Sequence, residues 1–121
     1  DVLHKGIHVV DAGSFQVVSS FRLEGHTPET LALDDPAKLL AVLCPATNRL
    51  FFLDPREGTI LGRGEGLPKG MYDAELATAK GIAVASSGGS GGIAVVDLRR
   101  VPWVRRPEAL PEGIEESAVA K

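Results

Sequence analysis

The chain has 121 residues, enough for one ordinary domain, with 44% hydrophobic residues, 24% charged residues and a net charge of −3. This mild negative charge argues against general attraction to nucleic acid or to an anionic membrane surface, and no uninterrupted apolar run reaches the roughly 18 residues that span a bilayer. The single cysteine, Cys44, excludes an internal disulfide framework and leaves the compartment undetermined.

Short apolar runs separated by turn residues predict a chain built almost entirely of strands. The first hairpin joins a strand over residues 7–10 to one over 15–23, through a turn that begins at Asp11. Further strands are expected over residues 29–33, 38–44, 49–54, 59–61, 71–77, 81–86 and 92–97, then around Trp103 and Val104, and over 114–120. The Ala-rich stretch 74–79 lacks a 3.6-residue apolar stripe, so no long helix is expected.

The motif Gly6-Ile7-His8-Val9-Val10-Asp11 occurs three times along the chain. It returns at residues 49–54 and 92–97, so that successive copies are 43 residues apart. A fixed period in this range is typical of repeats that each form one blade. Leu50-Phe51-Phe52-Leu53 is apolar on both faces, which indicates a sheet covered on both sides, as a propeller blade is by its neighbours. The predicted fold is therefore all-β, made of four-stranded antiparallel meanders arranged as β-propeller blades.

The period divides the chain into a single propeller segment of about two and a half to three blades. Residues 1–24 are expected to be the C-terminal half of a blade, 25–66 and 67–109 two full blades, and 110–121 the first strand of a further blade. Closed propellers usually contain at least about four blades, and an open stack would expose large apolar faces. We therefore expect the ring to be completed by additional blades from the same chain or from other chains.

The repeat resembles the YVTN type of β-propeller repeat, which runs from an apolar strand ending in Asp, through a Val-rich strand and a Gly-Pro connection, to another apolar strand and turn. Successive segments that follow this order are Ile7 to Asp11, Gln16 to Leu23, Gly25 to Pro28, Glu29 to Leu33 and Asp34 to Lys38. The later connections depart from it with Leu-Pro-x-Gly. The WD type of propeller repeat is the second choice, because Gly25-His26 and Leu53-Asp54 imitate its Gly-His and Trp-Asp pairs.

Acidic and polar residues occupy equivalent positions at the start of each predicted innermost strand. In a propeller these positions would ring one mouth of the central channel, where oxygen ligands could hold a polar ligand or a Ca²⁺ ion. The favoured interpretation is that these are ordinary polar residues exposed to solvent where a loop enters a strand. No cofactor is predicted. The candidates for a ligand or metal site are Glu29, Tyr72, Asp73, Glu115 and Glu116.

Two other charged sets have a structural interpretation. The repeated Asp11, Asp54 and Asp97 are expected to cap the turn between the third and fourth strands of each blade, because a residue needed in every blade serves the blade. A basic run formed by Arg99, Arg100, Arg105 and Arg106 could bind an acidic partner. Protection of an outer strand against aggregation is favoured for these arginines.

The sequence contains no recognisable catalytic motif, which favours a non-enzymatic function without deciding it. The favoured function is a non-catalytic propeller module that acts as a binding scaffold for a protein or small ligand, with no membrane contact and with nucleic acid an unlikely partner. The alternative is a propeller enzyme, such as a lactonase-like hydrolase or a quinoprotein-type dehydrogenase, with its site at the channel mouth. Fold alone does not choose between them.

Overall fold

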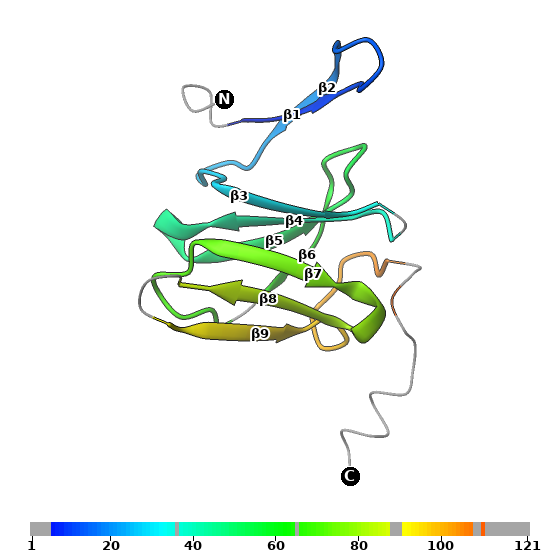
Figure 1. Cartoon of the computed structure of the whole chain (residues 1–121). Helices are drawn as coiled ribbons and strands as arrows, with labels where there is room; N and C mark the ends of the chain where they lie inside the picture. The colour runs from blue at the N-terminus through cyan, green and yellow to red at the C-terminus, as the bar shows by residue number, and fades with distance from the viewer. Residues whose placement is uncertain (1–5, 36, 65, 88–90, 108–109, 111–121) are drawn as a thin grey trace.

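The structure is a computed structural model that describes residues 6–35, 37–64, 66–87, 91–107 and 110. Within these residues the chain forms strands and two short 3₁₀ helices, and the strands make three antiparallel sheets that follow one another through the molecule (Figure 1). No helix in the described part of the chain is long and apolar enough to cross a membrane.

Each sheet is a meander in which sequence neighbours pair. The first sheet contains β1 (Gly6–Val10) and β2 (Val17–Arg22). The second contains β3 (Thr30–Asp34), β4 (Leu39–Cys44), β5 (Arg49–Leu53) and β6 (Ile60–Gly64). The third contains β7 (Asp73–Ala77), β8 (Ile82–Ser86) and β9 (Ile93–Asp97). The 3₁₀ helices are η1 (Pro45–Thr47), after β4, and η2 (Thr78–Lys80), after β7.

The 43-residue repeat of the sequence is also a repeat of backbone geometry. Strand β3 lies 43 residues before β7, and β1 lies 43 residues before β5. The β1–β2 and β5–β6 ladders shift register at equivalent places, between Val9 and Val10 and between Phe52 and Leu53. The prediction of antiparallel propeller blades is thus confirmed, with the two-stranded first sheet in the region predicted as half a blade.

The second sheet is covered on both faces because its strands carry apolar side chains in both directions. One face, including Leu50 and Phe52, packs against the third sheet in a cluster with Ala83 and Ala85. The opposite face, including Phe51 and Leu53, packs with Ile7 of the first sheet. Side chains fully removed from water at this sheet form the core of the molecule.

The prediction of a fourth strand around Trp103 and Val104 is wrong, and among the described residues the third sheet has three strands. The segment after β9 crosses to the second sheet, where the backbone N–H of Val104 donates to the carbonyl of Leu61 at 2.7 Å. The sequence here differs from that of β6 at two equivalent positions. Arg105 stands 43 residues after Gly62, and Pro107 stands 43 residues after Gly64, where proline has no N–H to donate to a neighbouring strand.

The predicted strand over residues 114–120, with Glu115 and Glu116, lies outside the described residues.

Candidate functional site at the first strands of the blades

The candidate site lies where β3 and β7, the first strands of the second and third sheets, run near each other. Both strands are preceded by the same kind of contact, with the Glu29 N–H donating to Leu43 O at 3.0 Å and the Tyr72 N–H donating to Ser86 O at 2.8 Å. The starts of the two strands are joined directly, because the Thr30 hydroxyl donates to the backbone carbonyl of Tyr72 at 2.6 Å. This contact brings equivalent ends of neighbouring blades together.

Two grooves follow from this arrangement. One, of about 490 Å³, is lined in part by Thr30, Asp73, Glu75 and Ser86. The other, of about 410 Å³, is lined mainly by apolar side chains that include Leu31, Leu33 and Leu76, together with Glu75. Asp73 and Glu75 are exposed carboxylates two residues apart on one strand, so they lie on the same face of β7. The surface can therefore contact a cationic or hydrogen-bond-donating group beside an apolar one.

Only some of the site residues predicted from the sequence line one of these grooves. Asp73 lines the groove of about 490 Å³, whereas Glu29 and Tyr72 line neither groove, and the Tyr72 backbone carbonyl accepts the Thr30 hydroxyl. Glu75 is a groove residue that the sequence interpretation missed, although its i+2 spacing from Asp73 was the available signal. Among the described residues, no group of three His, Cys, Asp or Glu side chains is placed to hold a metal ion.

The repeated aspartates Asp11, Asp54 and Asp97 lie apart from this groove, at the turns that follow β1, β5 and β9. The Asp54 carboxylate accepts the backbone N–H groups of Arg56 at 2.8 Å and Glu57 at 3.1 Å, and Asp11 accepts the N–H of Ser14 at 2.9 Å. Asp97 accepts the N–H of Arg99 at 3.0 Å. Each carboxylate therefore satisfies backbone donors that the turn would otherwise leave to water.

These contacts lower the pKa of all three carboxyls. For Asp11 the main cause is the hydrogen bond from the Ser14 hydroxyl. For Asp97 it is the hydrogen bond from the Arg99 guanidinium. At Asp54, partial burial acts to raise the pKa but is outweighed by the N–H groups of Glu57 and Arg56 and by the charge of Arg105.

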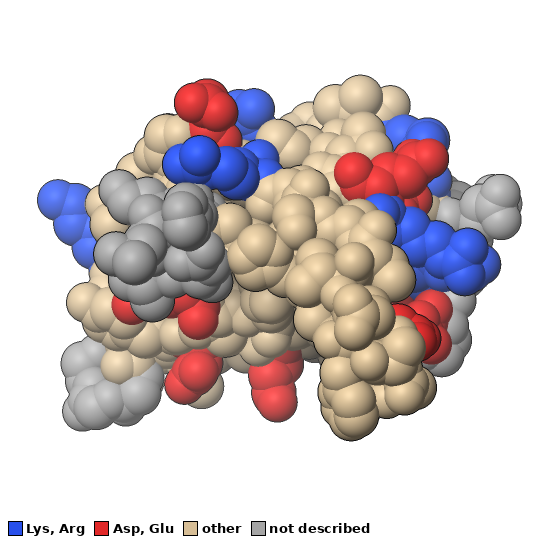
Figure 2. Space-filling model, turned by 90° about the horizontal axis from the view of Figure 1, so that it is seen from above, with Lys and Arg blue, Asp and Glu red and all other residues tan. Residues whose placement is uncertain are grey.

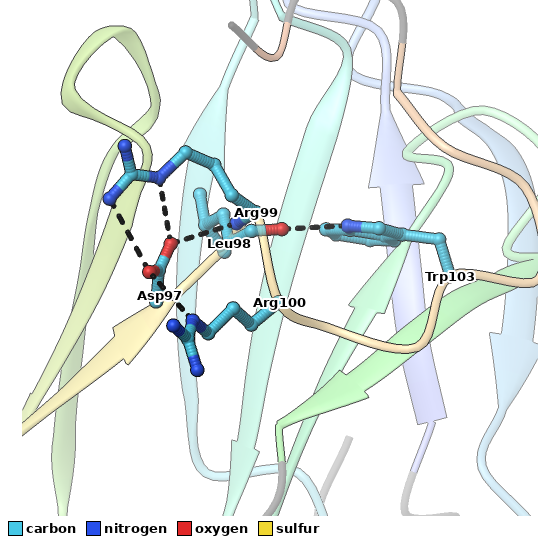
Figure 3. A network of polar contacts seen from close by, with 5 residues as sticks. All are labelled: Asp97, Leu98, Arg99, Arg100 and Trp103. Atoms are coloured by element: carbon cyan, nitrogen blue, oxygen red, sulfur yellow. Dashed lines mark hydrogen bonds and ion pairs between the residues drawn. The ribbon is translucent and has the colours of Figure 1, made fainter. Parts of the chain in front are cut away.

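The basic run is largely engaged within the chain. Arg99 donates through Nε to Asp97 Oδ1 at 3.0 Å, and Arg100 Nε lies 3.8 Å from Asp97 Oδ2 (Figure 3). Arg105 Nη2 lies 3.2 Å from Asp54 Oδ2. Arg106 is exposed. Binding of an acidic partner by these arginines stays a prediction, and such a partner would compete with the ion pairs.

Trp103 is a structural residue that the sequence interpretation assigned to a strand. Its indole N–H donates to Leu98 O at 2.8 Å (Figure 3), and its ring lies 5.3 Å from that of Phe52, centroid to centroid. It thus links the end of the third sheet to the core of the second.

Comparison with known proteins identifies the fold and nothing finer. No protein-family model and no curated protein matches the chain. Among solved structures, the hydrazine synthase of Kuenenia stuttgartiensis is similar with a TM-score of 0.67 and 17% sequence identity over 84% of this chain. The match covers 29% of the synthase chain, so this chain spans less than a third of its length. At this identity the likeness shows an incomplete propeller arrangement of blades.

Proposed function

We propose that the chain is a non-catalytic β-propeller module that acts as a binding scaffold, and that its open apolar faces pack against further blades. The carrying observation is that the outer face of the third sheet repeats the buried face of the second. Ile93 and Val95 are 69% and 62% exposed, whereas Leu50 and Phe52, 43 residues earlier, are fully buried against the third sheet. A blade placed beyond the third sheet would cover the former pair in the same way.

The first sheet presents a second open face at the opposite end of the stack. Val10 is 48% exposed, while the equivalent Leu53 is fully buried in the cluster below the first sheet. Seen from this side, the molecule has a broad area without Lys, Arg, Asp or Glu, and charged side chains gather around its rim (Figure 2). The first sheet also exposes the polar side chains of His8 and Ser20, whose Nδ1 and Oγ atoms lie 2.7 Å apart, so its open face is mixed rather than wholly apolar.

In a completed ring the groove beside Asp73 and Glu75 would lie toward the central channel, because the first strand of each blade is the innermost. A ligand bound there would contact carboxylates on one side and leucines on the other. Adding Ca²⁺ tests whether this site is instead a metal centre of an enzyme. We expect an unchanged melting temperature; a rise that Asp73→Ala abolishes would favour the metal site.

Light scattering of the 121-residue chain over a range of concentrations tests the scaffold proposal. We expect self-association that Ile93→Asp weakens, because a charge on the open face opposes packing against another blade. Ala46→Asp, on an exposed residue of η1, adds the same charge away from both open faces and should leave the association unchanged. A folded, monodisperse monomer at all concentrations would overturn the proposal.

A further inference from the structure

The outer edge of β9 carries backbone groups that point away from its sheet. Two hydrogen bonds fix their direction, from Ser87 N–H to Gly92 O and from Leu98 N–H to Gly81 O. Because such groups alternate along an antiparallel strand, residues 92, 94, 96 and 98 face β8. Those of Ile93, Val95 and Asp97 therefore face the opposite edge, and among the described residues β9 pairs only with β8.

The second sheet shows what occupies the same edge elsewhere in the repeat. There β6 pairs with β5, with Leu50 opposite Gly64 and Phe52 opposite Gly62. The N–H of Asp54 continues the ladder by donating to Thr59 O at 2.9 Å. The first sheet matches it, since the N–H of Asp11 donates to Gln16 O at 2.9 Å. Two of the three copies of this strand thus have an antiparallel neighbour on this edge.

The chain's own segment at the corresponding position is held elsewhere. Trp103 packs on Phe52, Val104 bonds to Leu61, and Arg105 forms ion pairs with Asp54 and with Glu57 at 3.8 Å. Pro107 could not supply the N–H that Gly64 presents to β5 in the second sheet. Local sequence and contacts with the second sheet therefore both keep this segment off the edge of β9.

We propose that the open edge of β9 binds an extended strand of another polypeptide, which adds antiparallel to the third sheet in the position that β6 takes beside β5. The bound strand has the pattern shared by β2 and β6, two apolar residues followed by a small one, as in Val17-Val18-Ser19 and Ile60-Leu61-Gly62. Main-chain hydrogen bonds supply affinity and the side-chain pattern supplies register. This inference rests on the proposed scaffold function and names one class of its partners.

A synthetic peptide with the sequence of residues 56–66 is the test ligand, because it carries the β6 pattern. Added to the 121-residue chain, it should slow hydrogen exchange at the amides of Ile93 and Val95, measured residue by residue by NMR. A scrambled peptide of the same composition should not. Slow exchange of these two amides before any peptide is added would overturn the proposal, because the edge would already be occupied.

N-methylation of single peptide amides provides a matched control for strand pairing. The amide of the glycine at position 62 would point toward β9, and that of the arginine at position 63 would point away, as they do in the second sheet. Methylation at 62 should weaken binding about tenfold or more, and methylation at 63 should have a much smaller effect. Equal effects would show apolar adhesion rather than strand addition and would overturn the proposal.

The experiments distinguish a failure of the scaffold proposal from a failure of the strand-addition proposal. Self-association lost with Ile93→Asp but no peptide protection at β9 would refute strand addition and keep the scaffold function. Peptide protection in a chain that is monomeric at all concentrations would refute packing through the open faces and leave the edge as the binding surface.

Discussion

The second and third sheets are built on the same 43-residue repeat, yet equivalent side chains lie in different surroundings. Leu50 and Phe52 are fully buried, whereas Ile93 and Val95 are mostly exposed. The strand is apolar in both sheets. The difference in burial therefore follows from the position of each sheet in the stack. Burial depends on the neighbouring sheet, which the second sheet has on both faces and the third has on one among the described residues.

The largest expected difference between these sheets is in the free energy of unfolding that is lost when the equivalent residues Leu50 and Ile93 are each replaced by alanine. Leu50→Ala should lower the free energy of unfolding by about 2–5 kcal/mol, because it leaves a cavity in a covered core. In dilute solution, where the chain is monomeric, Ile93→Ala should change it by no more than about 0.5 kcal/mol, because most of this side chain is then in water. Urea unfolding followed by circular dichroism measures both. Similar costs would mean that another molecule covers the third sheet in solution.

A smaller effect is expected where the third sheet's C-terminal segment packs on the second sheet. A Cβ at Gly62 would lie 2.6 Å from Trp103 Cε3 and 2.8 Å from Val101 Cγ1. Gly62→Ala should therefore lower the free energy of unfolding by about 1–3 kcal/mol through overpacking.

Gly64→Ala is the matched control for this substitution. Gly64 is two residues further along the same face of β6, and its added Cβ would meet Leu50 at 3.4 Å. This substitution should cost less than Gly62→Ala in the same urea titration. If Gly62→Ala were the milder change, Trp103 would not be packed on the second sheet in solution.

Most of the fold could be predicted from the sequence because its strongest signals are local and repeated. The turn after each apolar strand begins with the same acid, and the 43-residue spacing recurs in strand pairs, turns and register shifts. Strand boundaries were off by one to three residues, as at β6, which ends at Gly64 rather than Leu61, and at β7, which begins at Asp73 rather than Met71. The Tyr72 N–H still donates to Ser86 O just before the strand, so contact with β8 extends one residue beyond the regular pairing.

The missed fourth strand shows where a local pattern is insufficient. Trp103-Val104 matches Ile60-Leu61 in apolar character, but Arg105 and Pro107 replace two glycines that the second sheet needs for close packing and for a backbone donor. The comparison of registers could have found this. The Trp103 indole packs instead on Phe52. This contact depends on the distance between the two sheets, which cannot be read from a sequence pattern.

The candidate site was predictable only in part for a related reason. Alternation placed Asp73 and Glu75 on one face, so Glu75 was within reach of sequence reasoning. The Thr30 hydrogen bond to the Tyr72 carbonyl joins residues 42 apart in the chain and depends on how two sheets approach each other.

The smallest expected effect concerns the capping aspartates, which the two sheets hold by different contacts. The pKa of Asp97 is lowered mainly by Arg99, and that of Asp54 mainly by backbone N–H groups against partial burial. Because the pKa of each carboxyl is lower in the folded state than in the unfolded state, the unfolded chain binds more protons at pH values near and between these two pKa values. The stabilisation is therefore present above about pH 4, the unfolded value, and is lost as the pH falls through the folded pKa.

Asp97→Asn should make the acid limb of the stability profile shallower by about 1 kcal/mol or less, since the Arg99–Asp97 pair is partly exposed to water. Asp54→Asn should also flatten it, but high salt should reduce the effect of Asp97→Asn more, because its main contact is an ion pair. Asp35→Asn, in an exposed turn, controls for the change in net charge. Urea titrations between pH 2.5 and 6 at low and high salt measure the three profiles. An equal salt response at positions 54 and 97 would show that the two turns are held alike, and the contrast between the sheets would then be confined to their faces and edges.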